Sequence, residues 1–186
     1  MNWEANPCKK AERMSEILQK LKGGDLRSIG KADEVVQDIL NNPQLFGEVF
    51  EGMLDDDPRV RMRSADALEK VSSNHPEYLQ PFKTRLINEI AKIKQHEVRW
   101  HVAQMFSYLE INKKERDKII EILFSYIDGP GKSKIVKTFS MQTLADLAEK
   151  DEDIRPQIIR KLEEIMKTGS PAMVSRGKKL IKKLKE

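Results

Sequence analysis

The side chains best suited to metal binding or proton transfer are three histidines, His75, His96 and His101. A metal site on one helix needs ligands that share a face. His96 and His101 are five residues apart, which places them about 140° apart around a helix axis. The single cysteine, Cys8, can form neither an internal disulfide nor a cysteine-based metal site. These residues therefore predict no metal site and no cofactor.

The run Gly-Pro-Gly-Lys-Ser at residues 129–133 superficially resembles a phosphate-binding loop. Such a loop has the spacing GxxxxGK[ST] and follows a β-strand, and this run has neither property. We interpret it as a turn between two helices, because Gly and Pro interrupt helical structure. No nucleophile is paired with a base by its spacing, so we expect no enzymatic activity.

The elements that must position any functional side chain recur with a fixed period. Val60, Val98 and Val136 are 38 residues apart, and Met173 follows 37 residues after the last of them. Each of these anchors opens a stretch with apolar residues at helical spacing, and a second such stretch precedes it. Two helices per repeat predict an all-α fold, a right-handed α-α superhelix of stacked helix pairs.

Helix-breaking residues divide the chain into five parts of one predicted domain, residues 1–186. Residues 1–42 form a degenerate N-terminal capping pair, in which the first helix ends at Gly23-Gly24 and the second runs from about Leu26 to Asn41. The repeat pairs are residues 43–75, 76–112, 113–150 and 151–186. The apolar positions from Leu79 to Ile93 predict one helix before Val98. The last helix has one apolar stripe and is otherwise rich in lysine, as a terminal repeat requires.

Composition narrows the class of protein. The net charge of +4 is a balance of 34 basic and 30 acidic residues, which does not by itself imply a polyanionic partner. No apolar run approaches the roughly 20 residues that a membrane span needs, and the N-terminus lacks an apolar signal core. We expect an intracellular, cytoplasmic protein with no membrane partner and no small-molecule substrate.

The run Asp-Pro-Arg-Val-Arg at residues 57–61, with Ala65, Ala67 and Leu68 after it, resembles a HEAT repeat. The resemblance extends with decreasing fidelity across residues 43–186. It implies that the second helix of each pair lines the concave side of a curved stack. Proteins with this repeat range from transport receptors to chromatin, kinase-scaffold and DNA-repair proteins, so the resemblance says little about function.

The resemblance also implies a structural role for an Asp before each Val-Arg pair, which helps to form a ladder between neighbouring repeats. Asp55 has this position before Val60, but Ile93 and Gly131 replace it before the next two anchors. Arg99 and Lys137 therefore lack the usual acidic partner, which leaves their structural role open.

A helix turns about 100° per residue, so the repeat predicts which positions face away from the core. The positions two, six and nine residues after each anchor should form the exposed wall. It runs from acidic (Asp66, Glu69) through neutral to basic residues. From this wall we take the candidate partner-binding residues Met62, Trp100, Gln104, Thr138 and Gln142.

Trp100 would anchor a partner, because a large exposed aromatic is typical of binding hot spots. Gln104 and Gln142 could pair with the backbone of an extended peptide, in analogy with armadillo-like proteins. The alternatives are that Trp100 packs against the neighbouring repeat and that both glutamines are solvated surface.

Candidate contacts for an anion or a nucleic acid are Arg61, Arg99 and Lys137 at the seams between repeats and Lys179 and Lys182 on the last helix. A nucleic-acid groove should be basic along its length. Because Asp66 and Glu69 lie on the same predicted wall, nucleic-acid binding is the second choice. Some HEAT-like proteins are DNA glycosylases with acidic and aromatic groove residues, for which Asp66 and Trp100 are the least favoured candidates.

We therefore predict a non-catalytic protein-interaction scaffold that binds a protein or peptide segment in a concave groove. A third alternative is a structural subunit that meets its partner through apolar seams instead of the groove.

Overall fold

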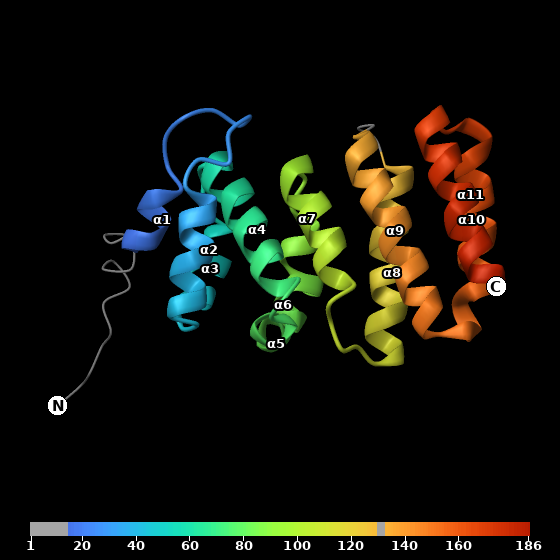
Figure 1. The fold of residues 1–186 in the computed structure, drawn as a ribbon, viewed down its shortest axis with the longest axis horizontal. Coiled ribbons are helices and arrows are strands. Elements are labelled where there is room, and N and C mark those ends of the chain that lie inside the picture. Colours follow the sequence, from blue (N-terminus) through green and yellow to red (C-terminus); the bar gives the residue numbers. More distant parts are fainter. Residues whose placement is uncertain (1–14, 130–132) are drawn as a thin grey trace, which may run out of the picture. The chain divides into compact units, whose positions relative to one another are not determined.

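The computed structural model describes residues 15–129 and 133–186, and these residues contain helices and no strands. The α-helices (Figure 1) are α1 (Glu16–Lys20), α2 (Ala32–Asn41), α3 (Leu45–Gly52), α4 (Pro58–Ser72), α5 (Pro76–Leu79), α6 (Lys83–Asn88), α7 (His96–Phe106), α8 (Lys113–Asp128), α9 (Lys134–Lys150), α10 (Arg155–Thr168) and α11 (Pro171–Lys185). The prediction of an all-α fold is confirmed. None of the helices in these ranges is long and apolar enough to cross a membrane.

The chain divides into two compact units, residues 1–68 and residues 69–186, and the boundary falls inside α4. In the first unit, α1 packs against α2 and α3. Its core contains fully buried side chains such as Val35, Ile39 and Phe50. Gly52 ends α3 where a Cβ atom would meet the side chains of Ser64 and Leu18, so only glycine allows this close approach.

The second helix of this unit is shorter than the sequence predicts. It begins at Ala32, and residues 22–31 form a turn-rich segment instead of the predicted helix from Leu26. Three glycines in this segment, Gly23, Gly24 and Gly30, adopt positive φ angles, which are incompatible with a right-handed helix. The side chain of Ile29, expected on an apolar helix face, is 43% exposed.

Arg63 of α4 determines the path of this segment. Its side chain is only 1% exposed. The guanidinium donates to four backbone carbonyl oxygens, those of Leu21 at 2.6 Å, Gly23 at 2.7 Å, and Asp25 and Ser28 at 3.0 Å each. A buried guanidinium is tolerated only when its donors find acceptors. The carbonyls of a helix point along its axis, so a loop satisfies Arg63 better than a helical turn would.

In the second unit, the helices after the anchors lie side by side. α9 packs against α7 and against α11, while α8 and α10 pack against α9 from the other layer (Figure 1). The anchors Val98, Val136 and Met173 are at most 7% exposed, as the 38-residue period predicts. Leu180, Ile181 and Leu184 of α11 are buried, so the apolar stripe of the last helix faces the core.

The helix predicted from Leu79 to Ile93 is interrupted. α5 ends at Leu79, a 3-10 turn follows at Gln80–Phe82, α6 ends at Asn88, and a second 3-10 turn spans Ile90–Lys92. Pro81 has no N–H to donate to a continuing helix, which explains the first interruption. The predicted break at residues 129–133 lies partly outside the described residues. On its two sides, α8 ends at Asp128 and Ser133 caps α9.

Candidate functional site

The surface that could hold a partner in the second unit is formed by α7, α9 and α11. Two contacts fix the spacing of these helices. Thr143 Oγ1 of α9 donates to the carbonyl oxygen of Ala103 of α7 at 2.7 Å in the core. Gly177 of α11 lies where a Cβ atom would come within 2.7 Å of Met166 and 3.5 Å of Met141. The three helices are therefore held as one packed layer, and side chains on them have fixed relative positions.

Trp100 lies half-buried on α7. Its ring meets the imidazole of His101 edge to face, with ring centroids 5.3 Å apart and an interplanar angle of 71°. His101 is 7% exposed. Burial, reinforced by the charge of Lys70, lowers the pKa of His101 to about 3. The imidazole is therefore neutral at physiological pH, and it supports Trp100 as an apolar neighbour.

The glutamines of the predicted wall differ from one another. Gln104 is half-buried one turn beyond Trp100, and no side-chain hydrogen bond of Gln104 occurs within the described ranges. Gln142 has both ends of its amide occupied. Its Nε2 donates to Asp146 Oδ1 at 2.8 Å, and its Oε1 accepts from Arg176 Nη1 at 3.2 Å. The amide of Gln142 therefore connects α9 to α11, and its pairing with a peptide backbone stays a prediction.

Two further members of the predicted wall differ in burial. Met62 is 6% exposed, so it is a core residue and not a surface contact. The residues that follow it, Arg63, Ser64 and Ala65, are also buried. Four consecutive residues cover most of the helix circumference, so α4 is enclosed on more than one face here. Thr138 remains half-buried on α9, and its Oγ1 donates to the carbonyl oxygen of Lys134 at 2.8 Å.

The seam arginines have structural partners that the sequence does not reveal. Arg61 Nη1 donates to the carbonyl oxygens of Asp55 at 2.7 Å and Asp56 at 3.0 Å. Arg99 Nε donates to the carbonyl oxygen of Ile93 at 2.8 Å, and its guanidinium lies 4.9 Å from the ring centroid of Tyr126. A carbonyl group accepts from arginine whatever side chain the residue carries. Arg99 therefore has a structural role without the acidic residue that the resemblance led us to expect.

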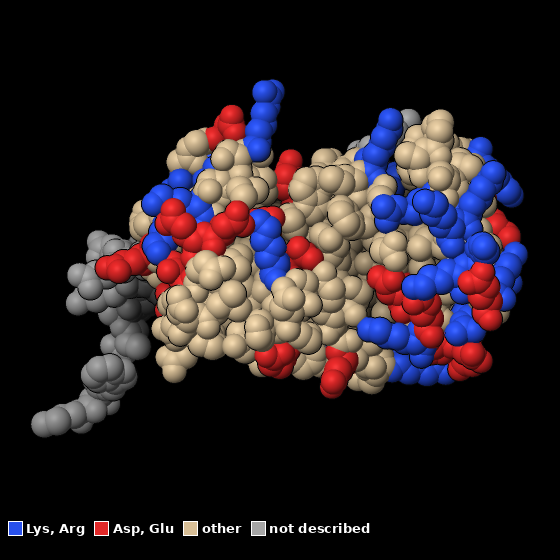
Figure 2. Space-filling model, in the orientation of Figure 1, with Lys and Arg blue, Asp and Glu red and all other residues tan. Residues whose placement is uncertain are grey.

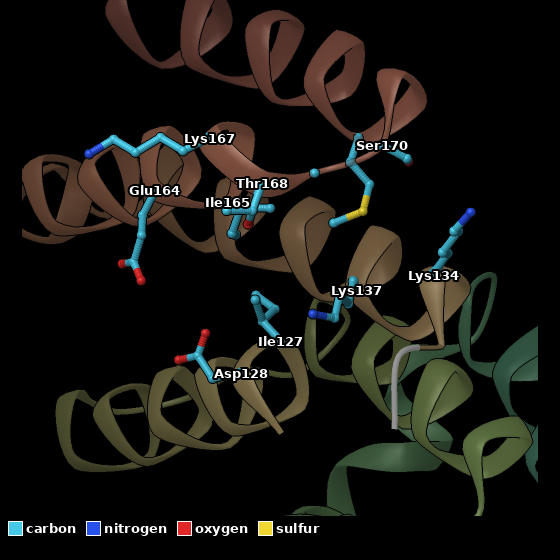
Figure 3. A pocket seen from close by; sticks show the side chains of 11 residues that line it. Ile127, Asp128, Lys134, Lys137, Glu164, Ile165, Lys167, Thr168 and Ser170 are labelled. Carbon is cyan, nitrogen blue, oxygen red and sulfur yellow. The ribbon is translucent and has the colours of Figure 1, made fainter. Parts of the chain in front are cut away.

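Lys137 lines a different feature, a cavity of about 470 Å³ near the α10–α11 turn. Figure 3 shows Lys137 and Asp128 pointing into this space, while Lys134 and Lys167 point away from it. Asp128 is bound by Lys161 at 2.7 Å. Because the cavity presents charges of both signs, it does not define an anion site.

The basic residues of the second unit concentrate at its C-terminal end. Residues 155–186 contain ten basic and three acidic side chains, an excess of seven positive charges. Figure 2 shows lysines and arginines gathered over α10 and α11, whereas the surface over α7 is mostly neutral. Lys179 and Lys182 are exposed. Lys182 forms only a long surface ion pair with Glu186, at 3.6 Å.

Arg176 is the functional candidate that the sequence reasoning missed. It is three residues after the anchor Met173 and therefore lies outside the rows two, six and nine residues after each anchor. The long side chain reaches diagonally to Gln142 on the neighbouring helix. Arg176 comes 34 residues after Gln142, and Lys183 comes 34 residues after Glu149, from which it is 2.6 Å away. This shared spacing between a polar residue and a basic residue is the signal in the sequence that could have identified Arg176.

The remaining histidines add no site. His75 contacts Glu77 at 3.0 Å and stacks on Tyr78, and His96 is exposed at the start of α7. Within the described residues, no group of three or more His, Cys, Asp or Glu side chains could hold a metal ion.

These observations define an α-solenoid whose most prominent feature is a packed layer of helices and not a reactive cluster. A family model of the HEAT repeat domain matches residues 19–184. The chain belongs to this family. HEAT repeat domains are typically protein-interaction scaffolds and are usually non-catalytic. Neither the curated proteins nor the solved structures provide a match.

Proposed function

We propose that this chain is a non-catalytic scaffold that binds an extended segment of a partner protein across α7 and α9. The observation that carries this proposal is the position of Trp100. A half-exposed indole on a rigid helix, supported from behind by a neutral buried imidazole, loses little conformational entropy on binding. Gln104, one turn away, provides an amide whose groups are available to a peptide backbone.

The candidate contacts of this proposal belong to one packed layer. Trp100 and Gln104 lie on α7, and Thr138 occupies on α9 the position equivalent to Trp100. Because α7 and α9 are joined by the buried Thr143–Ala103 hydrogen bond, these side chains form a surface that needs no rearrangement to bind. Preorganisation of this kind reduces the entropic cost of association.

The proposal is tested by selecting a displayed library of random 12-residue peptides on the wild-type protein. Peptides that bind the wild type and lose at least about tenfold in affinity with Trp100→Ala support it. Phe124→Ala is the matched control, because Phe124 is another half-buried aromatic and lies on α8 in the other layer. Equal losses in the two variants, or no Trp100-dependent peptide, would overturn the proposal.

Nucleic-acid binding is a second candidate because of the excess of seven positive charges in residues 155–186. It predicts a steep fall in affinity for a labelled single-stranded oligonucleotide between 50 and 200 mM salt, of about 10³-fold or more for six or more phosphate contacts. Binding to the α7–α9 surface predicts a weak salt dependence.

A further inference from the structure

We infer that the segment bound by α7 and α9 continues onto α11 and carries acidic residues about five or six positions from the residue that contacts Trp100. This inference rests on the proposed function and adds the chemistry of the ligand. It depends on the face of α11 that adjoins α9, on the charges along that face and on the distance between neighbouring helices.

The face of α11 toward α9 is identified by two interhelical contacts. Arg176 binds Gln142 and Lys183 binds Glu149, and both partners are on α9. Lys179 lies between Arg176 and Lys183 at helical spacing and therefore shares their face. Unlike them, Lys179 has no ion pair or hydrogen bond in the part of the chain that the structure describes.

The charges along this edge favour an acidic ligand. The acidic side chains that face it from α9 are Asp146 and Glu149, and each already has a partner: Asp146 accepts from Gln142, and Glu149 binds Lys183. The hydrogen bond to Glu149 also raises the pKa of Lys183. Arg176, Lys179 and Lys183 therefore outnumber these two acids by one. By contrast, α7 presents the neutral residues Trp100, Gln104 and Ser107. The layer thus has a neutral end and a basic end.

The helix spacing sets the separation of the two features in the ligand. Packed helices are roughly 8–10 Å apart, so α11 lies about 16–20 Å from α7 across α9. An extended chain covers about 3.3–3.6 Å per residue. A segment with its hydrophobic residue on Trp100 therefore reaches Lys179 after about five or six residues.

Two charge reversals on α11 test the inference. Lys179→Glu alters the face that Arg176 and Lys183 direct toward α9. Lys185→Glu makes the same change of charge on the face that meets α10, where Lys185 lies 3.9 Å from Glu163. The probe is a fluorescent 12-residue peptide with one Phe and a Glu-Glu pair in a Gly-Ser background, made in versions with two to nine residues between them.

We expect affinity to be highest at a separation of about five or six residues. Lys179→Glu should bind that peptide about tenfold more weakly, and Lys185→Glu less than about twofold. An equal effect of both variants, or no dependence on the separation, would overturn the inference. A single-stranded oligonucleotide that displaces the peptide from the wild type and fails to do so from Lys179→Glu would also overturn it, since the site would then select nucleic acid.

The failure of the inference and that of the proposed function give different results. If the selected library contains Trp100-dependent peptides without acidic residues, and if these bind Lys179→Glu with unchanged affinity, the proposed function holds and the inference about acidic residues is wrong. If no selected peptide depends on Trp100, the proposed function fails and the inference fails with it.

Discussion

Arg99 donates its Nε–H to the carbonyl oxygen of Ile93, six residues earlier in the chain, at 2.8 Å. Arg61 makes the same connection to Asp55, also six residues earlier, at 2.7 Å. In both repeats the arginine after the anchor valine closes the turn that leads into its own helix. In both turns the arginine binds a backbone acceptor, so the contact does not depend on the side chain at that position.

Arg99→Ala should lower the free energy of unfolding by about 1–3 kcal/mol, because the variant loses a charge-assisted hydrogen bond and the packing of the guanidinium on Tyr126. Urea denaturation followed by circular dichroism measures this change. Arg160→Ala is the control, since Arg160 is exposed on α10. If both variants unfold at the same urea concentration, the proposed role of the Arg99–Ile93 contact is wrong.

Arg63→Met should destabilise the first unit by about 3 kcal/mol, since four backbone carbonyl oxygens lose their donor, that of Leu21 in a buried bond and the other three in part-buried bonds. Hydrogen exchange should show faster exchange at residues 22–31 than elsewhere. Gly30→Ala perturbs the same contact between Arg63 and the carbonyl groups of residues 21–28. Its φ of +56° disfavours a side chain, and the new Cβ would lie 2.9 Å from the guanidinium carbon of Arg63.

Comparing Arg63→Met, Gly30→Ala and the double variant tests whether Gly30 and Arg63 stabilise the same contact. We expect non-additive destabilisation, because both substitutions disrupt one structure. Additive losses would show that Gly30 and Arg63 contribute independently.

The sequence predicts the repeat well because its signal is the burial of one residue per repeat. The anchor valines are buried whatever the loops around them do, so periodicity alone predicts the stacked helices. The same reasoning fails for the segment from Leu26 to Gly30. Its apolar spacing matches a helix, but the buried guanidinium of Arg63, distant in the sequence, binds its carbonyls in a loop.

The candidate site is predicted only in part for a related reason. A helical wheel gives the direction of a side chain relative to one core but not the number of faces that are covered. Met62, expected on the exposed wall, is therefore buried, and Trp100 is half-buried. The wheel also omits contacts made diagonally between helices, such as that between Arg176 and Gln142.

The stability of the protein should fall as the pH is lowered from 6.5 toward 5, and His101 should be a main cause. The pKa of His101 in the folded protein is about 3, below its ordinary value of 6.5, because burial disfavours the imidazolium. Between these pH values the unfolded chain binds the additional proton, so protonation favours unfolding. Over this interval His101 lowers the free energy of unfolding by at most about 1.4 kcal/mol per pH unit.

Urea denaturation at pH 7.5, 6.5, 5.5 and 5.0 measures this dependence. His101→Gln should reduce it, whereas His96→Gln, at an exposed position, should not. Hydrogen bonds from Arg59 and Arg116 lower the pKa of Asp57, to about 2, and of Asp151. The stability that these two carboxylates contribute is present above the carboxyl pKa of the unfolded chain and is lost only at lower pH. It therefore does not affect the interval between pH 5 and pH 6.5. An unchanged pH profile in His101→Gln would refute the assignment.

The contact between Gln142 and Arg176 should stabilise the α9–α11 packing without being a direct contact to the partner. Gln142→Ala and Arg176→Ala should each lower the free energy of unfolding by about 0.5–1.5 kcal/mol, as expected for one partly buried hydrogen bond. The double variant should lose less than the two single changes together, because either substitution removes the same bond. Gln104→Ala should change stability by no more than about 0.5 kcal/mol.

Peptide affinity distinguishes this role from direct binding. If Gln142 only positions Arg176, its truncation should weaken a Trp100-dependent peptide less than Gln104→Ala does, since the Gln142 amide binds Asp146 and Arg176 whereas the Gln104 side chain forms no hydrogen bond among the described residues. A larger loss of peptide affinity in Gln142→Ala, with the free energy of unfolding unchanged, would mean that the peptide displaces Arg176 and Asp146 and binds the Gln142 amide directly.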